Sequence, residues 1–353
     1  MKESLYGKTL QDLESLVLEL GYKKYNGEQI LRWLYQSFKT NIEDMSNLSI
    51  PLREALKEKY EIFLPEIVKK QVSYDGTIKY LLKLNDGNLV ESVLMRYTYG
   101  NAVCVSSQVG CNMGCSFCAS GLLKKVRDLS ASEMVAQVMC VQLDLNKSNE
   151  RVSHIVIMGI GEPFDNYDNV MKFIYCINEA KGLAIGARHI SVSTSGIVPK
   201  IIKLMEEKIQ INLAISLHAS NNEIRNKIMK VNQAYNMDNL KEALLQYCNK
   251  TNRRITFEYI LLKGINDSTE NALELVKWLD GTCSYVNLIP YNAVNESNYQ
   301  RSDEKSINNF YNLLKKYKIN VTIRREFGKD IDAACGQLRA KSEGKKNGNK
   351  GKN

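Results

Sequence analysis

The stretch that decides the fold runs from Gly110 to Cys118 and reads Gly-Cys-Asn-Met-Gly-Cys-Ser-Phe-Cys. Its three cysteines, Cys111, Cys115 and Cys118, follow the spacing C-x3-C-x2-C. Three thiolates in this pattern can each ligate one iron of a four-iron cluster, which leaves the fourth iron open to a small molecule. Zinc is the competing metal, but it normally takes four ligands, often as two C-x2-C pairs, and no second pair lies nearby. The spacing therefore favours an iron–sulfur cluster.

From about residue 101 the chain alternates strand-like and helix-like segments. Ser130-x-x-Glu133 forms a capping box at the start of one of the helices. Six such units predict a parallel sheet with helices outside it, and the cluster motif then follows the first strand. The strand-like runs are 102–105, 154–158, 190–194, 211–217, 255–261 and 286–289, and a last run follows at 320–326.

Polar residues in the predicted strands indicate an open barrel. In the run 211–218, Asn212, Ser216 and His218 share one parity, and apolar residues share the other. A closed barrel fills its interior with bulky apolar side chains, so a polar inner face predicts a barrel that holds a ligand. The predicted fold class is α/β, a partial βα barrel. The same parity in the neighbouring strands collects Ser191, Ser193, Ser195, Thr256 and Glu258.

Two smaller regions precede the predicted barrel. Thr9 and Asp12 start the first of three helical patterns, and Pro51 fits the first turn of the third. Asp75-Gly76 and Asn85-Asp86-Gly87 are turns between short strand-like runs, which predicts a β-meander. The predicted layout is a helical accessory domain at 1–64, the meander at 65–100, the core barrel at 101–338 and a basic, disordered tail at 339–353. The helical domain either docks RNA or caps the main body.

Composition limits the classes of function. The chain has 353 residues, a net charge of +9 and nine cysteines. No run of eighteen apolar residues is present and the N-terminus lacks the pattern of a signal peptide, so we expect a cytoplasmic protein. The basic balance suits RNA, although paired lysines and arginines also occur on ordinary solvated surfaces. The scattered cysteines are expected to be small buried hydrophobic residues, namely Cys140, Cys176, Cys248 and Cys283.

A cluster motif that opens a βα barrel resembles the radical S-adenosylmethionine (SAM) superfamily. The segment 158–163, Met-Gly-Ile-Gly-Glu-Pro, follows the second predicted strand and is similar to the superfamily's glycine–glutamate segment. The resemblance implies one 4Fe-4S cluster on the three motif cysteines. It implies that SAM binds the open iron and is cleaved, on reduction, to a 5′-deoxyadenosyl radical. Gly161 would let the backbone approach the cofactor, and Glu162 would pair with its ammonium group. An electron donor such as flavodoxin or ferredoxin is also implied.

Further segments narrow the resemblance to the RlmN/Cfr family of radical SAM RNA methyltransferases, and Val109 is more similar to the RlmN branch. That branch methylates C2 of an adenosine in the peptidyl-transferase centre of 23S rRNA and of the adenosine next to the anticodon in tRNA. The Cfr branch, which methylates C8, stays open. The matching segments are 104–111, 193–196, 216–219, 287–292 and 330–338, and the resemblance extends over about residues 9–340.

The family resemblance also implies roles for individual residues. Cys335 would carry the methyl group, Cys104 would be its partner, and Glu91 would accept a proton. Composition alone favours buried structural thiols for both cysteines, and Glu91 could simply face solvent. The residues implied to contact SAM, besides the glycine–glutamate segment, are Ser193, Ser216, Leu217, His218 and Asn292.

The chemistry explains why two thiols outside the cluster are needed. A ring carbon of adenine is electrophilic and cannot displace a methyl group from a sulfonium, whereas the Cys335 thiolate can. A second SAM molecule then yields the radical, which removes hydrogen from the S-methyl group, and the methylene radical adds to the ring carbon. After proton removal, attack by Cys104 on the Cys335 sulfur releases the RNA and leaves a disulfide. Two SAM molecules are used per turnover.

Two other classes of function remain open from the sequence. One is a radical enzyme that activates a partner protein or small molecule. The other is a non-catalytic RNA-binding protein with a structural metal. Transfer of the cofactor's methyl group to RNA separates the three hypotheses. We expect a monomer that acts on 23S rRNA and tRNA.

Overall fold

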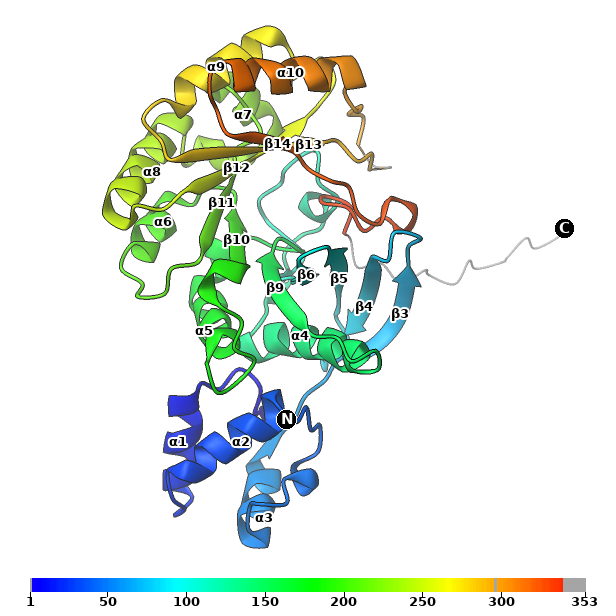
Figure 1. Cartoon of the computed structure of the whole chain (residues 1–353), viewed down its shortest axis with the longest axis vertical. Coiled ribbons are helices and arrows are strands. Elements are labelled where there is room, and N and C mark those ends of the chain that lie inside the picture. The colour runs from blue at the N-terminus through cyan, green and yellow to red at the C-terminus, as the bar shows by residue number, and fades with distance from the viewer. Residues whose placement is uncertain (1, 295–296, 339–353) are drawn as a thin grey trace, which may run out of the picture.

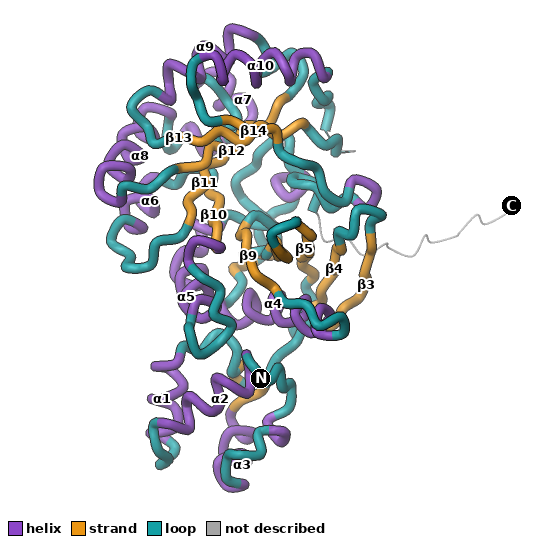
Figure 2. Tube along the Cα trace, viewed as in Figure 1, coloured by secondary structure: helices purple, strands orange, loops and turns teal. Residues whose placement is uncertain are grey.

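The computed structural model describes residues 2–294 and 297–338, so the predicted tail at 339–353 lies outside the described residues. The main body is one curved, ten-stranded sheet in the order β14-β13-β12-β11-β10-β9-β6-β5-β4-β3. Figure 1 shows helices along the outer side of this sheet and a small helical module below it. Figure 2 shows long loops gathered on the inner side.

The parallel part of the sheet contains the six predicted strands and, as its seventh strand, the last predicted run at 320–326. Among the described residues, β14 pairs only with β13 and β3 only with β4, so the sheet does not close. The predicted open βα barrel is confirmed. The parallel strands are β6 (Gly100–Cys104), β9 (Val152–Ile157), β10 (Ile190–Thr194), β11 (Asn212–Ser216), β12 (Ile255–Leu261), β13 (Ser284–Pro290) and β14 (Val321–Ile323). The helices that cover them are α4 (Ala131–Asn146), α5 (Tyr167–Asn178), α6 (Val198–Leu204), α7 (Asn222–Ile228), α8 (Met237–Thr251), α9 (Thr269–Leu279) and α10 (Glu304–Lys316).

The two faces of the parallel strands differ in polarity, as their parity predicts. Leu213 and Ile215 of β11 are buried in the main hydrophobic core. Ser216 stands directly opposite Glu258 of β12, and both belong to the other face, which lines a cavity. Because side chains alternate along a strand, the apolar set packs against the helices and the polar set points inward.

The meander continues the same sheet with antiparallel strands. It consists of β3 (Glu66–Val72), β4 (Ile78–Lys83) and β5 (Leu89–Tyr97), and β5 pairs with β6. Gly76 and Gly87 adopt φ angles of +83° in the two turns, a conformation that glycine takes without strain. Lys79, Val93 and Cys104 are cross-strand neighbours in one row, so their side chains share the inner face. The meander therefore forms part of the wall of the barrel.

The N-terminal helices form as the capping signals predict. They are α1 (Leu10–Glu19), α2 (Tyr25–Tyr35) and α3 (Ile50–Lys59), with the Thr9–Asp12 capping box at the start of α1. A Cβ on Gly27 would lie 2.7 Å from the backbone nitrogen of Glu14, so only glycine allows α1 and α2 to approach this closely. Gly7 meets the start of α4 in the same way, at 2.5 Å from the nitrogen of Ser132, which ties the module to the barrel.

The remaining elements are short. Two pairs of short strands are β1 (Glu3–Ser4) with β2 (Tyr60–Glu61) and β7 (Gln108–Val109) with β8 (Arg127–Asp128). None of the helices in residues 2–294 and 297–338 has both the length and the hydropathy of a membrane span. Short 3₁₀ helices lie at η1 (Ile42–Asp44), η2 (Ala119–Leu122), η3 (Pro163–Asn166), η4 (Ala187–His189), η5 (Lys230–Gln233) and η6 (Lys329–Ile331).

The scattered cysteines are buried with one exception. Cys140, Cys176 and Cys248 are buried free thiols, as predicted. The prediction is wrong for Cys283, which is exposed. Cys283 lies in the turn between α9 and β13, and its backbone N–H approaches the Cys248 sulfur at 3.3 Å. Its apolar neighbours in the sequence belong to the following strand, whereas the turn itself faces outward.

Candidate active site

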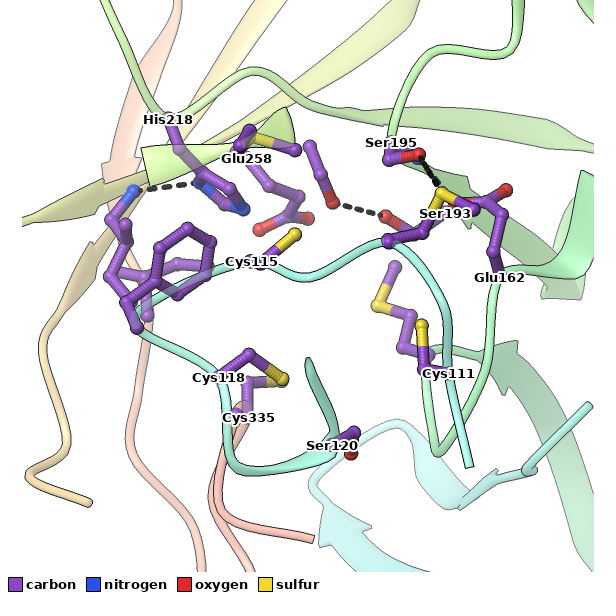
Figure 3. Close-up of a pocket in the computed structure, with 18 of the residues that line it drawn as sticks. Cys111, Cys115, Cys118, Ser120, Glu162, Ser193, Ser195, His218, Glu258 and Cys335 are labelled. Carbon is purple, nitrogen blue, oxygen red and sulfur yellow. Dashed lines mark hydrogen bonds between the residues drawn. The ribbon is translucent and has the colours of Figure 1, made fainter. Parts of the chain in front are cut away.

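A cavity lies at the carboxyl ends of the parallel strands, where ligands bind in α/β sheets. The three motif cysteines face the inner side chains of the strands across it (Figure 3). Segments far apart in the sequence meet here, because the Cys335 loop lies beside the cysteine motif. The lining includes Cys111, Cys115, Cys118, Gly161, Glu162, Ser193, Ser195, Ser216, His218, Glu258, Arg324 and Cys335.

The cluster loop is held in place by glycine turns and backbone contacts. Gly110 and Gly114 have positive φ angles of +75° and +61°. A Cβ on Gly110 would lie 2.1 Å from the carbonyl oxygen of Lys124, so that position admits only glycine. The Ser116 N–H donates to the Ile228 carbonyl at 3.0 Å, which fixes the loop to the end of α7.

The three cysteines fit a four-iron cluster. Burial raises the pKa of the Cys115 thiol, and the neighbouring thiols of Cys118 and Cys111 raise it further. A metal centre offsets this cost, because coordination deprotonates a thiol. Within the described part of the chain, no three Cys, His, Asp or Glu side chains are grouped to hold a single metal ion. A cluster differs in this respect, since each thiolate binds its own iron.

The glycine–glutamate segment forms one wall of the cavity. Gly161 has a φ of +106°, and a Cβ there would lie 2.6 Å from the Cβ of Gln108. The two carboxylate oxygens of Glu162 accept the backbone N–H groups of Phe164 at 2.9 Å and Ser195 at 2.7 Å. Burial raises the pKa of Glu162, and these hydrogen bonds act in the opposite direction. The carboxylate is therefore fixed at the cavity wall.

Three predicted SAM contacts come from neighbouring strands. The hydroxyl oxygens of Ser193 and Ser216 lie 3.2 Å apart. His218 has a φ of +57°, and its Nδ1 accepts the backbone N–H of Ile260 at 3.0 Å. Burial, followed by the charge of Arg225, lowers the pKa of His218 to about 3. The imidazole is neutral at physiological pH, and because Nδ1 is the acceptor, Nε2 carries the proton.

The other two predicted SAM contacts, Asn292 and Leu217, do not line the first cavity. Asn292 lines a second cavity, which shares Met158, Arg324 and Cys335 with the first. Leu217 is fully buried in the main core and does not line either cavity. Its backbone N–H donates to the Glu258 carbonyl at 3.1 Å, which ties its main chain to the strand that carries Glu258.

The second cavity brings together the two cysteines that lie outside the cluster motif. Cys104, at the end of β6, and Cys335 both line it. Burial, followed by the nearby Cys335, raises the pKa of the Cys104 thiol to about 12. Burial also raises the pKa of Cys335, whereas the Arg324 guanidinium lowers it. Figure 3 shows Cys335 beside Cys118, and Cys335 lines both the cavity of the cluster loop and the cavity of Cys104.

Glu91 is buried on β5, with 5% of its surface exposed, so the alternative that it faces solvent is wrong. It does not line either cavity. It lies two residues before Val93, on the same face of the strand, and Val93 lines the second cavity opposite Cys104. The Lys79 ammonium lies 3.6 Å from its carboxylate.

An ion pair between a half-buried arginine and a buried glutamate lies next to the thiols and belongs to no sequence motif. Arg324 lines both cavities, and its Nη1 lies 3.5 Å from a carboxylate oxygen of Glu258. Asn287 donates to the same carboxylate at 3.0 Å. In the sequence Arg324 is half of a basic pair with Arg325. Its position at the end of the last predicted strand was the signal that could have found it, because side chains there reach the ligand site.

Comparisons with known proteins define the class. The model of the radical SAM superfamily matches residues 105–276. A solved radical SAM methyltransferase from Sphaerobacter thermophilus superposes with a TM-score of 0.93 at 41% identity, covering 96% of this chain and 100% of that one. The chain is thus a member of the radical SAM superfamily, whose proteins use a 4Fe-4S cluster and SAM.

The family within that superfamily follows from two further findings. The model of the ribosomal RNA large subunit methyltransferase N-terminal domain matches residues 4–62. A protein from Spiroplasma citri named "Probable dual-specificity RNA methyltransferase RlmN" is 55% identical over 97% of this chain and 98% of its own length. A protein of the same name from Listeria monocytogenes serovar 1/2a is 55% identical over 96% and 94%. The chain belongs to the RlmN family.

Proposed function

We propose that this protein methylates C2 of an adenosine in 23S rRNA and of the adenosine next to the anticodon in tRNA. The observation that carries the proposal is that Cys104 and Cys335 line one cavity, which shares a wall with the cavity of the motif cysteines. A protein that only generated a radical would have no use for this second pair of thiols. The relatives' names support RNA as the substrate and two kinds of RNA as targets.

Residues of the first cavity would hold the cofactors. Cys111, Cys115 and Cys118 would bind the cluster, which with SAM supplies a radical that can remove a hydrogen atom from a methyl group. The fixed carboxylate of Glu162 would receive the ammonium of SAM, and the neutral His218 could donate from Nε2. Further contacts would come from Gly161, Ser193, Ser216, the Leu217 backbone and Asn292.

Cys335 would carry the methyl group. Its thiolate would displace the methyl of a first SAM, so that a thioether forms and S-adenosylhomocysteine leaves. Arg324 favours this reaction because its positive charge stabilises the thiolate. A second SAM would provide the radical that takes a hydrogen atom from the S-methyl group, and the resulting carbon radical would bond to C2 of the adenine.

Cys104 and Glu91 would release the product. The radical adduct would return one electron to the cluster, which had supplied one for SAM cleavage, and Glu91 would accept the proton lost from the ring carbon. The Cys104 thiolate would then attack the Cys335 sulfur. The bond between that sulfur and the methylene carbon breaks, the carbon takes up a proton, and methylated RNA and a Cys104–Cys335 disulfide are left. A reductant must return this disulfide to two thiols before the next cycle, and a flavodoxin or ferredoxin would supply the electrons.

Residues 1–64 would form an RNA-docking domain, 65–100 a meander that supports the site, and 101–338 the core. Charge alone does not carry the docking role, because Lys24 pairs with Glu14 and Arg32 with Glu28. The match of residues 4–62 to the N-terminal domain of rRNA methyltransferases supports it. We further propose that the protein acts as a monomer in the cytoplasm.

Methyl-labelled SAM tests this function. The reconstituted protein is incubated anaerobically with reductant and with 23S rRNA or tRNA, and the labelled carbon is mapped by mass spectrometry of the nucleosides. We expect label at C2 of adenosine in both RNAs. Label at C8 would replace the proposal with the Cfr-type reaction. SAM cleavage without any transfer to RNA would overturn it in favour of a radical activating enzyme.

A further inference from the structure

The β3–β4 hairpin binds the loop that carries Cys335. The Ser73 hydroxyl donates to the carboxylate of Asp330, and the Asp75 carboxylate accepts the backbone N–H of Gly328 at 3.0 Å. These contacts join parts of the chain that are more than 250 positions apart, at separations of 257 and 253. The hairpin therefore fixes the first part of the loop, upstream of the thiol.

Lys79 extends this contact into the interior of the barrel. Only 8% of its surface is exposed, and its ammonium donates to the backbone carbonyl of Asp332 at 3.1 Å. The same ammonium lies 3.6 Å from the carboxylate of Glu91. One buried cation thus touches both the Cys335 loop and the candidate proton acceptor.

The register of the sheet places these groups over the second cavity. Lys79 pairs with Val93, and Val93 pairs with Cys104, so the three side chains form one row on the inner face. Glu91 is a diagonal neighbour of Lys79 in the same sheet. The loop packs onto this row, because Phe327 and Ala333 share a hydrophobic cluster with Val93 and Cys104.

Burial of a lysine at this position requires interactions that compensate for the loss of water. Removing an ammonium from water is costly, and an apolar side chain would fill a sheet interior without that cost. Lysine offers three N–H donors from one flexible stem, so it can bind a carbonyl of the loop and a carboxylate of the sheet together.

We propose that Lys79 is a positioning residue, which holds the Cys335 loop and the Glu91 carboxylate in one arrangement above Cys104. This inference rests on the proposed function. It explains how the methyl-carrying thiol and the proton acceptor meet the same adenine, although they come from opposite ends of the chain.

The test compares Lys79→Met with Lys83→Met. Lys83 lies on the same strand but is exposed and pairs with Glu66, so its replacement is the matched control. Amide hydrogen exchange of residues 328–334 in the cluster-loaded protein is expected to be at least about tenfold faster in Lys79→Met than in the control. RNA methylation is expected to fall by roughly 10- to 100-fold, because misplacement of reacting groups by about 1 Å has effects of this size.

Two further variants separate the contacts of Lys79. Lys79→Gln can still donate to the Asp332 carbonyl but cannot balance the Glu91 charge, so loop exchange should stay slow while the protein–RNA adduct lasts longer. In Lys79→Met combined with Glu91→Gln, the lifetime of the adduct should be no longer than in Glu91→Gln alone. If Lys79→Met does not fold, Ser73→Ala removes the outer contact and should speed exchange of the same loop.

The outcomes distinguish this inference from the proposed function. Unchanged loop exchange in Lys79→Met overturns the positioning role, and where that variant does not fold, an unchanged adduct lifetime in Lys79→Gln overturns it. Multiplicative effects of Lys79→Met and Glu91→Gln on adduct lifetime overturn the link to Glu91. If the unmodified protein transfers no methyl group to Cys335 or RNA, the proposed function fails, whereas hydrogen exchange still decides whether Lys79 holds the loop.

Discussion

The cluster loop and the Cys335 loop reach the same cavity by different physical means. The cluster loop owes its shape mainly to its own backbone, with left-handed turns at Gly110 and Gly114 and a local hydrogen bond from the Cys111 N–H to the Leu123 carbonyl. Its bond from Ser116 to the distant Ile228 then fixes the formed loop to α7. The Cys335 loop depends on distant partners, among them Ser73, Asp75 and Lys79 of the meander. A radical source needs a rigid site, whereas a methyl carrier has to meet SAM, RNA and a second thiol in turn. The two functions should therefore be separable by mutation.

The largest expected effect is on the cluster side. Cys111→Ala should remove one cluster ligand and lower both SAM cleavage and RNA methylation by more than about a hundredfold, since even supporting groups of metal sites matter 10- to 100-fold. Visible absorbance of the cluster and release of the adenosyl product measure the loss. Cys140→Ala, at a buried thiol away from the cavity, is the control and should keep both. Full absorbance and activity in Cys111→Ala would show that the cluster assignment is wrong.

A smaller and more selective effect is expected at the second thiol pair. Cys104→Ala should leave SAM cleavage within about twofold of normal but trap the RNA on Cys335, because no thiolate remains to attack the sulfur. Denaturing gel electrophoresis with labelled RNA detects the adduct, and Cys176→Ala serves as a buried-cysteine control. Rapid, complete turnover by Cys104→Ala would show that Cys104 does not release the RNA. SAM cleavage and product release would then not be separable by this mutation.

The smallest effect concerns the pH dependence of folding stability, through a histidine in the cavity that both loops line. The pKa of His218 is lowered in the folded protein to about 3 from an ordinary value of 6.5, so below about pH 6.5 the unfolded chain binds a proton that the folded chain does not. Stability should therefore fall on acidification, by about 2 kcal/mol between pH 7 and pH 5 from this residue. Urea unfolding at the two pH values measures the difference.

The control for this pH dependence is a substitution outside the cavity. His218→Asn should reduce the loss of stability between the two pH values, whereas Lys83→Met, at an exposed strand position, should leave that loss as it is in the unmodified protein. An equal loss in the protein with and without His218 would mean that its burial does not set the acid sensitivity of the site.

The sequence predicted those parts of the fold that local patterns determine. The capping boxes at Thr9 and Ser130, the turn glycines and the polar parity of β11 each depend on residues close in the chain. The same holds for the C-x3-C-x2-C motif. For this reason the strands, the open barrel and the cysteine loop could be predicted from the sequence.

Other features depend on tertiary contacts that no local pattern records. In the sequence, Lys79 is an ordinary polar residue of a strand. Its role becomes visible only in the structure, where it donates to the Asp332 carbonyl. Arg324 reads as surface charge, although it pairs with Glu258 inside the barrel. Cys283 reads as a core residue because its neighbours are apolar, but the turn that carries it faces outward. Long-range contacts determined the first two positions, and the outward-facing turn determined the third.

The central claim is that Cys335 carries the methyl group, and mass spectrometry of the purified, active protein tests it most directly. The peptide that contains Cys335 should carry one methyl group on sulfur, and methyl-labelled SAM should label the same peptide. Cys335→Ala should lose that label and all RNA methylation while it still cleaves SAM. An active enzyme whose Cys335 is never methylated would contradict the account.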